Sequence, residues 1–555
     1  MKFFKIVIFI VSFCPLFTLA QRPKDNVVSN ELTSLPLRPK LVVGIVVDQM
    51  RWDYLYRYAN RYGAGGFNRM LKEGFTCENT QIPYVPTVTA AGHTGIYTGS
   101  VPSIHGIAGN DFIIQATGKN MYCTEDSTVQ GVGVKGKVGQ MSPRNLLAST
   151  ITDELKLATN FRSKVIGIAL KDRGGILPAG HAANAAYWYD DSEGSWITST
   201  YYMQQLPNWV NNFNNLKLAE KYIKQDWNTL YPINTYTQST ADHSPYEGKL
   251  RGEEAPTFPH STSKMLNGNF NAIRITPYGN TLTLDFAKAA IKNEQLGQGK
   301  ETDFLAVSLS STDYVGHQYG VNAVETEDTY LRLDKELESF FNSLDLTLGK
   351  GQYTVFLSAD HGAAHNPQFL KDHQIPADQW NGSAVIKGLN ERLAQQFKQD
   401  RLVLSFSNYQ VNFNNILIEQ SNLNLEDLKE AAISYLNKQD GIAYAIDMEK
   451  ASIASIPDAI KSKVINGYNR QRSGAIQILL NPGLFQGYSK TGTTHGTWNP
   501  YDTHIPLVFM GWGIKHGSTN RLTTMSDIAP TLAALLHIQE PNGNIGLPIE
   551  EVLKK

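Results

Sequence analysis

Residues 41–47 read LVVGIVV and run directly into Asp48, and two later segments repeat this arrangement. The run FLAVSLSST ends at Asp313, and the run YTVFLSA ends at Asp360. Short apolar runs of this kind are typical of strands buried on both faces, as in a parallel sheet flanked by helices. Because ligands of open α/β sheets bind beyond the carboxyl ends of the strands, we expect these carboxylates to meet at one edge. The sequence therefore predicts a metal-assisted enzyme.

Strand-like runs alternate with helical stretches along most of the chain, which predicts βαβ units and an α/β fold. We expect a central, mostly parallel sheet with helices on both faces. The predicted strands are 41–47, 164–170, 303–309, 353–358, 475–480 and 505–510. The predicted helices are 145–158, 282–293, 324–344 and 425–437.

Two segments interrupt the pattern and are interpreted as insertions into a single catalytic domain, residues 21–555. Residues 187–275 are rich in Tyr, Trp, Asn, Thr and Pro. They are expected to cover the catalytic edge, either to shape substrate access or as a purely structural cap. Residues 385–470 are expected to form a second insertion, with helices around a small strand pair.

Composition limits the function classes. The chain has 555 residues, of which 41% are hydrophobic and 18% are charged, as expected for a soluble globular protein with a substantial core. The formal net charge is −1, so no overall basic field favours nucleic acid as a partner.

The first 20 residues are predicted to be a secretory signal peptide. A basic start, Met1–Lys5, precedes an apolar run that ends in Thr18-Leu19-Ala20, which supplies small residues for cleavage after Ala20. This run is short for a membrane span, so we expect no stable anchor, although an anchor is the alternative. We therefore expect a periplasmic or secreted protein. Cys77 and Cys123 would remain after cleavage, either as a disulfide or as two buried free thiols.

Histidines accompany the strand-end carboxylates. His317 follows Asp313 by four residues, so one helical turn would place both side chains on one face. His361 follows Asp360 directly, and His495 lies in the glycine-flanked segment GTTHG. One Asp after a strand is more often a helix cap than a ligand, so the prediction rests on recurrence. Mixed His and carboxylate ligands favour zinc or another borderline divalent metal.

A nucleophile is expected in residues 86–111, PTVTAAGHTGIYTGSVPSIHGIAGND. Thr87 and Thr89 precede a short helical pattern of small residues. A hydroxyl at a helix N-terminus lies near exposed N–H groups and a positive dipole end, which suits an anion. A nearby metal would lower its pKa and activate it. Without the metal ligands, Thr89 would be interpreted as a helix cap.

The order of Asp48, PTVTAAGHTGIYTG…HGI, STDYVGHQYG, SADHG and TTHG resembles the alkaline phosphatase superfamily, whose related branch contains nucleotide pyrophosphatases and phosphodiesterases. The motifs span residues 48–495, nearly the whole mature chain. The resemblance implies an alkaline-phosphatase-like fold and two zinc ions per chain. It implies Asp313, His317 and His495 as the ligands of one zinc. For the second zinc it implies Asp48, Asp360 and His361, with Thr89 as exchangeable ligand and nucleophile.

Another predicted strand ends at the segment KDRGG, where Lys171 and Arg173 are expected to point toward the same edge. A phosphate monoester carries about two negative charges and a diester one, so a paired Lys and Arg favour monoesters. A solvated Lys and Arg at a strand end is the alternative. This element and Asn110 resemble the threonine-nucleophile alkaline phosphatases of the PafA type. By that resemblance Asn110 and Arg173 would bind nonbridging oxygens, and Lys171 would extend toward the transferred group.

We therefore expect an alkaline phosphatase that hydrolyses small phosphate monoesters through a phosphothreonine intermediate. Inorganic phosphate is expected as product and inhibitor, and the protein is expected to be a monomer. The first alternative is a phosphodiesterase or nucleotide pyrophosphatase on the same fold. The second is a metal-stabilised protein that binds phosphorylated ligands without turnover.

Overall fold

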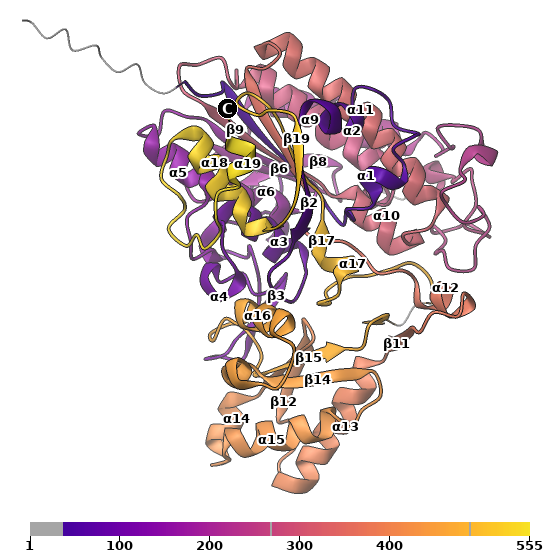
Figure 1. The fold of residues 1–555 in the computed structure, drawn as a ribbon, viewed down its shortest axis with the longest axis vertical. Helices are drawn as coiled ribbons and strands as arrows, with labels where there is room; N and C mark the ends of the chain where they lie inside the picture. The colour runs from indigo at the N-terminus through magenta and orange to yellow at the C-terminus, as the bar shows by residue number, and fades with distance from the viewer. Residues whose placement is uncertain (1–36, 267–268, 488–489, 555) are drawn as a thin grey trace, which may run out of the picture. The chain divides into compact units, whose positions relative to one another are not determined.

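A computed structural model describes residues 37–266, 269–487 and 490–554 (Figure 1). The predicted signal peptide, residues 1–20, lies outside these described residues. Across the described ranges, none of the helices has both the length and the apolar character that a membrane span requires.

In the described part of the chain the largest sheet has 11 strands, and its middle is parallel. The middle strands are, in spatial order, β10 (Tyr353–Ser358), β1 (Leu41–Val47), β9 (Asp303–Leu309), β6 (Val165–Ala169) and β7 (Ala185–Asp190). Every residue of these five strands is buried, which explains their continuous apolar or small-residue sequences. The parallel pairing of these five strands matches the predicted mostly parallel sheet, and antiparallel pairs flank them on both sides.

Helices cover both faces of this sheet, as predicted. The chain passes from β6 to β7 through α6 (Asp172–Ala179) and later returns to β9 through α9 (Tyr278–Asn293). Right-handed crossovers in opposite directions place their helices on opposite faces. Figure 1 shows α3 (Thr89–Thr98) on the side of α6, and α10 (Ser311–Tyr319) and α11 (Val324–Leu348) on the side of α9.

Several predicted elements have different bounds in the structure, and two of these differences have a clear local cause. The helix predicted for 145–158 is α5 (Ile151–Ala158), because Thr150 and Asp153 form a capping box that sets its start. The strand predicted for 505–510 is divided at Pro506, which has no N–H to donate, into β17 (His504–Ile505) and β18 (Leu507–Gly511).

A second sheet of four strands has its own apolar cluster. Its strands are β12 (Val403–Ser407), β13 (Gln410–Phe413), β15 (Ile476–Leu480) and β14 (Ile442–Asp447). Helices α13 (Gly382–Phe397) and α15 (Leu425–Leu436) pack against it (Figure 1, orange). The strand predicted for 475–480 therefore belongs to this sheet. The bounds proposed for the insertion at 385–470 stay a prediction.

The segment 187–275 begins within the central sheet. It contains the end of β7 and then β8 (Ser195–Ser199), which pairs antiparallel with β7. Short helices and 3-10 turns follow, including α7 (Asn208–Asn215) and α8 (Leu218–Ile223). Whether this segment acts as a cap stays a prediction.

Cys77 and Cys123 are both free and buried in the described chain, so the free-thiol alternative holds. Cys77 lies in the main apolar cluster and Cys123 in a separate one, which leaves no disulfide between them.

Candidate active site

Four neighbouring parallel strands deliver the predicted side chains to one edge of the central sheet. Asp360 lies just beyond β10, and Asp48 directly follows β1. Asp313 lies in the first turn of α10, which follows β9. Lys171 is the residue before the first turn of α6 (the N-cap position), just beyond β6. Because these strands are adjacent and parallel, their carboxyl ends bring the four residues together.

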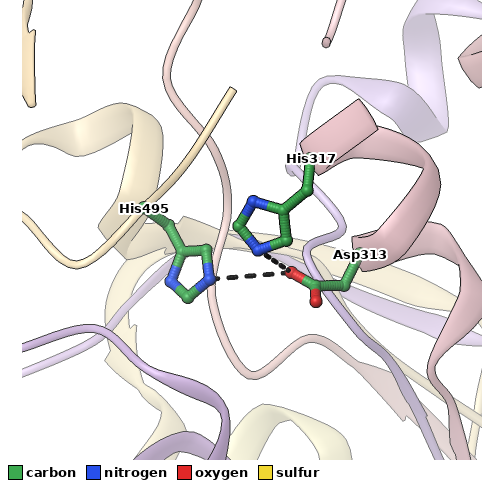
Figure 2. Close-up of side chains that lie close together, drawn as sticks. All are labelled: Asp313, His317 and His495. Carbon is green, nitrogen blue, oxygen red and sulfur yellow. Dashed lines mark ion pairs between the residues drawn. The ribbon is translucent and has the colours of Figure 1, made fainter. Parts of the chain in front are cut away.

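Asp313, His317 and His495 form the first group (Figure 2). Both Nε2 atoms face Oδ1 of Asp313, that of His317 at 3.1 Å and that of His495 at 3.6 Å. The first two residues are one turn apart on α10, as the four-residue spacing predicts. One ligand atom from each residue lies within 4.8 Å of the other two, a separation that suits binding of one ion.

Asp48, Asp360 and His361 form the second group, and all three are fully buried. His361 Nε2 lies 3.5 Å from an oxygen of each carboxylate. Among the described residues, Asp48 Oδ1, Asp360 Oδ2 and His361 Nε2 have no hydrogen-bond partner, although the ring of His93 has Nδ1 3.2 Å from Asp360 Oδ2. Unpaired buried polar atoms are costly, so three of them converging on one point fit a metal site.

The three histidines share one hydrogen-bond arrangement. Each places Nδ1 against a backbone carbonyl, so Nδ1 carries the proton and the Nε2 lone pair points into its group. This tautomer is the one that binds a metal through Nε2. The acceptors are Thr493 for His317 at 2.9 Å, Gly362 for His361 at 3.0 Å and Thr87 for His495 at 2.7 Å.

Lys171 connects the two groups. Its Nζ lies 2.6 Å from Asp48 Oδ2 and 2.6 Å from Asp313 Oδ2. Burial disfavours its charge, but Asp313 and Asp48 outweigh burial and raise the pKa of Lys171. Burial and the nearby Asp360 raise the pKa of Asp48 well above its ordinary value. The site thus concentrates negative charge that cations neutralise.

Thr89 is the first residue of α3 and is 1% exposed. The adjacent N–H of Ala90 donates to Oδ1 of Asn110 at 2.9 Å, which holds this side chain beside the helix N-terminus. Arg173 donates from Nη1 to the Tyr122 hydroxyl at 3.0 Å. Its buried Nε has no partner among the described residues, so it can donate to an anion.

Sequence reasoning missed two residues that support the groups. Gln49 donates from its backbone N–H to Asp360 Oδ1 at 3.1 Å and from Nε2 to Asp313 Oδ1 at 2.6 Å. It has φ 65°, which is uncommon outside glycine. His93 lies one turn after Thr89, with Nδ1 2.9 Å from Thr89 O and 3.2 Å from Asp360 Oδ2. The four-residue spacing between Thr89 and His93 was a signal that could have identified the histidine.

Residues 42–504 match the family model described as type I phosphodiesterase / nucleotide pyrophosphatase. A protein of Myroides odoratus named calcium-transporting ATPase is 60% identical over 93% of this chain and 95% of its own length. Alkaline phosphatase PafA of Elizabethkingia meningoseptica is 54% identical over 93% of this chain and 95% of its own length. Alkaline phosphatase PhoV of Synechococcus elongatus is 53% identical over 99% of this chain and 100% of its own length. The crystal structure of wild-type alkaline phosphatase PafA superposes with a TM-score of 0.92 at 53% identity, covering 94% of this chain and 100% of that chain.

Proposed function

Since the chain belongs to the type I phosphodiesterase and nucleotide pyrophosphatase family, we propose that it is an alkaline phosphatase that hydrolyses phosphate monoesters and releases inorganic phosphate. One observation carries this proposal: two cations, the buried Lys171 and the half-buried Arg173, accompany two ligand groups and a hydroxyl at a helix N-terminus. A monoester has about one more negative charge than a diester, so it gains more from the two cationic side chains that accompany the ligand groups.

The two groups fit zinc, because each combines carboxylate oxygens with imidazole Nε2 atoms. We propose one zinc for each group. When bound, the two ions would lower the pKa of the attacking hydroxyl and neutralise charge on the reacting oxygens.

The chain's own residues have separate roles in the proposed reaction. The Thr89 oxygen attacks phosphorus, the bond to the leaving alcohol breaks, and phosphothreonine forms. A water molecule then attacks the phosphothreonine and breaks its P–O bond to Thr89, which restores the Thr89 hydroxyl and releases phosphate. The Asn110 amide and the Arg173 guanidinium donate to nonbridging oxygens. The ammonium group of Lys171 stabilises the negative charge that accumulates in the transition state.

A phosphodiesterase is the second candidate, favoured by the description of the family. The relative named calcium-transporting ATPase adds ATP to the compounds that need testing. We also propose that residues 1–20 direct export to the periplasm or beyond and that the mature protein is a monomer.

The test combines elemental analysis with an activity panel on the purified, zinc-loaded protein. We expect two zinc ions per chain and a higher kcat/KM for an aryl phosphate than for an aryl phosphodiester, with ATP as a third substrate. Thr89→Ala should abolish turnover and the phosphoryl adduct seen by mass spectrometry, whereas Thr89→Ser should retain part of both. A diester preference would select the second candidate, and no turnover by the parent would indicate a binding protein.

A further inference from the structure

A cavity of about 270 Å³ lies against the candidate active site. Its lining comes from the nucleophile segment, from the loop that carries His495, and from the lobe built on the second sheet. The lining residues used below are Pro86, Val88, Asn408, Tyr409, Gln486 and His495.

The position of this cavity relates it to the leaving group. Val88 directly precedes Thr89, and His495 belongs to the group with Asp313 and His317. In in-line transfer the leaving oxygen lies opposite the attacking oxygen, on the side of the ion that does not activate the nucleophile. The group with His495 would hold that ion, and His495 lines the cavity, so an alcohol that departs on this side would extend toward the cavity.

The tip of the β12–β13 hairpin is constrained where it meets the cavity. Ser407 pairs with Gln410, so Asn408 and Tyr409 are the two turn residues, with φ 57° and 58°. Such turns favour asparagine first and glycine second, so a tyrosine there is strained and needs support from its surroundings. Strain of this kind is concentrated at binding and catalytic sites.

Contacts with the nucleophile segment and with Gln486 hold the tip in place. Asn408 Nδ2 donates to the carbonyl of Asp111, the residue after Asn110, at 2.9 Å. The Gln486 N–H donates to the Tyr409 hydroxyl at 3.0 Å, which fixes the ring. The hairpin tip is therefore held in place where Asn408 and Tyr409, together with Gln486, line the cavity.

We propose that this cavity is a leaving-group subsite for alcohols that contain a flat ring with polar edges, such as a nucleoside or a phenol. The inference rests on the proposed function. The Tyr409 ring, Pro86 and Val88 supply apolar contact, and the amides of Asn408 and Gln486 supply hydrogen bonds. A methyl group is too small to reach them. Contacts remote from the reacting bond raise kcat/KM when they are retained in the transition state.

The test compares adenosine 5′-monophosphate and phenyl phosphate with methyl phosphate in the zinc-loaded full chain. Tyr409→Ala should lower the kcat/KM ratio of each ring substrate to methyl phosphate about tenfold, and Tyr409→Phe should retain most of it. Asn408→Gly keeps the positive φ while removing the amide, and it should lower the adenosine ratio more than the phenyl ratio. Asn422→Gly is the matched control, because Asn422 is exposed, has φ 50° and does not line the cavity.

Ratios equal to the parent's in Tyr409→Ala and Asn408→Gly would overturn the subsite while leaving the phosphatase intact. Equal loss on all substrates in Tyr409→Ala would also overturn it, because that result indicates a structural role. A parent without activity on methyl phosphate or either ring substrate would overturn the proposed function and the subsite together.

Discussion

The ammonium group of Lys171 lies 2.6 Å from Oδ2 of Asp313. The same ammonium lies 2.6 Å from Oδ2 of Asp48, so one side chain joins a carboxylate of each ligand group. All three side chains are almost completely buried. Lys171 thus compensates the two carboxylates that come closest to it, and it adds positive charge where a phosphoryl group would bind.

We expect Lys171→Met to lower kcat/KM for monoesters by about 100-fold, since removing one buried electrostatic contact to the transition state commonly has this effect. Diester hydrolysis should fall less because the diester carries less charge. The metal-free variant should also lose about 3 kcal/mol of unfolding free energy, because Asp48 and Asp313 lose their cation.

Steady-state kinetics and denaturant unfolding of the metal-free protein measure these effects. Lys164→Met is the control, because Lys164 precedes the same strand at its opposite end. Equal losses on monoesters and diesters would contradict the charge argument.

Gly92 allows α3 to approach Asp360. A Cβ at this position would lie 2.4 Å from the Asp360 carbonyl oxygen and 2.6 Å from its Cβ. Gly92→Ala must therefore displace either the helix that begins at Thr89 or a predicted metal ligand. We expect at least a tenfold loss of kcat, because catalysis depends on sub-ångström placement, and a destabilisation of about 1–3 kcal/mol.

Gly95→Ala provides a control on the same helix. Its Cβ would first meet the flexible Met525 Sδ at 3.1 Å, so both activity and stability should change little. Kinetics and thermal unfolding of the two zinc-loaded variants test the comparison. A Gly92→Ala enzyme with parental kcat would show that α3 and Asp360 can separate without consequence.

The strands and the meeting of the ligand groups could be predicted because both depend on local patterns. Strands β1, β9 and β10 have the predicted bounds, since burial on both faces requires continuous apolar residues. Their carboxyl ends meet because parallel neighbours share an edge. The start of α5 depended on a capping box, whose Thr150 and Asp153 were visible in the sequence but were not recognised.

Other features depend on contacts between distant segments. Gln49 bridges Asp360 and Asp313, which lie 311 and 264 residues away, and no local pattern identifies such a bridge. The sheet to which β15 belongs is set by pairing with β13 and β14, and a short apolar run does not specify its partners.

His93 is expected to position both the nucleophile and a ligand. Nδ1 faces Thr89 O and Asp360 Oδ2, and Nε2 lies 2.8 Å from the Ser308 hydroxyl. His93→Phe removes these contacts from a fully buried site. Because residues that orient metal ligands typically contribute this much, zinc affinity should fall by about 10- to 100-fold.

Competitive zinc titration measures the affinity, and kcat at saturating zinc separates metal loss from misplacement of Thr89. Ser308→Ala removes one contact of His93 and should have a smaller effect than His93→Phe. If His93→Phe bound zinc as tightly as the parent, His93 would contribute only to packing and would not position a ligand.

His260 is expected to make the free energy of unfolding decrease as the pH becomes alkaline. It is fully buried, with Nδ1 3.0 Å from Glu253 Oε1 and Nε2 3.0 Å from Glu325 Oε1. Burial alone would lower its pKa, but the hydrogen bonds with the two carboxylates raise the pKa of His260 to about 9. Its ordinary value in an unfolded chain is about 6.5.

A raised folded-state pKa means that the folded protein holds the proton more tightly than the unfolded chain. The stabilisation is therefore complete below about pH 6.5 and is lost as pH rises through about 9. We expect the unfolding free energy to fall by up to about 3 kcal/mol over this window. His260→Gln should be less stable than the parent at pH 7 and should show a flatter profile toward pH 10. Urea unfolding across this pH range measures the effect, and the exposed His516→Gln serves as control. If the parent and His260→Gln lost the same free energy, another group would be responsible for the alkaline transition.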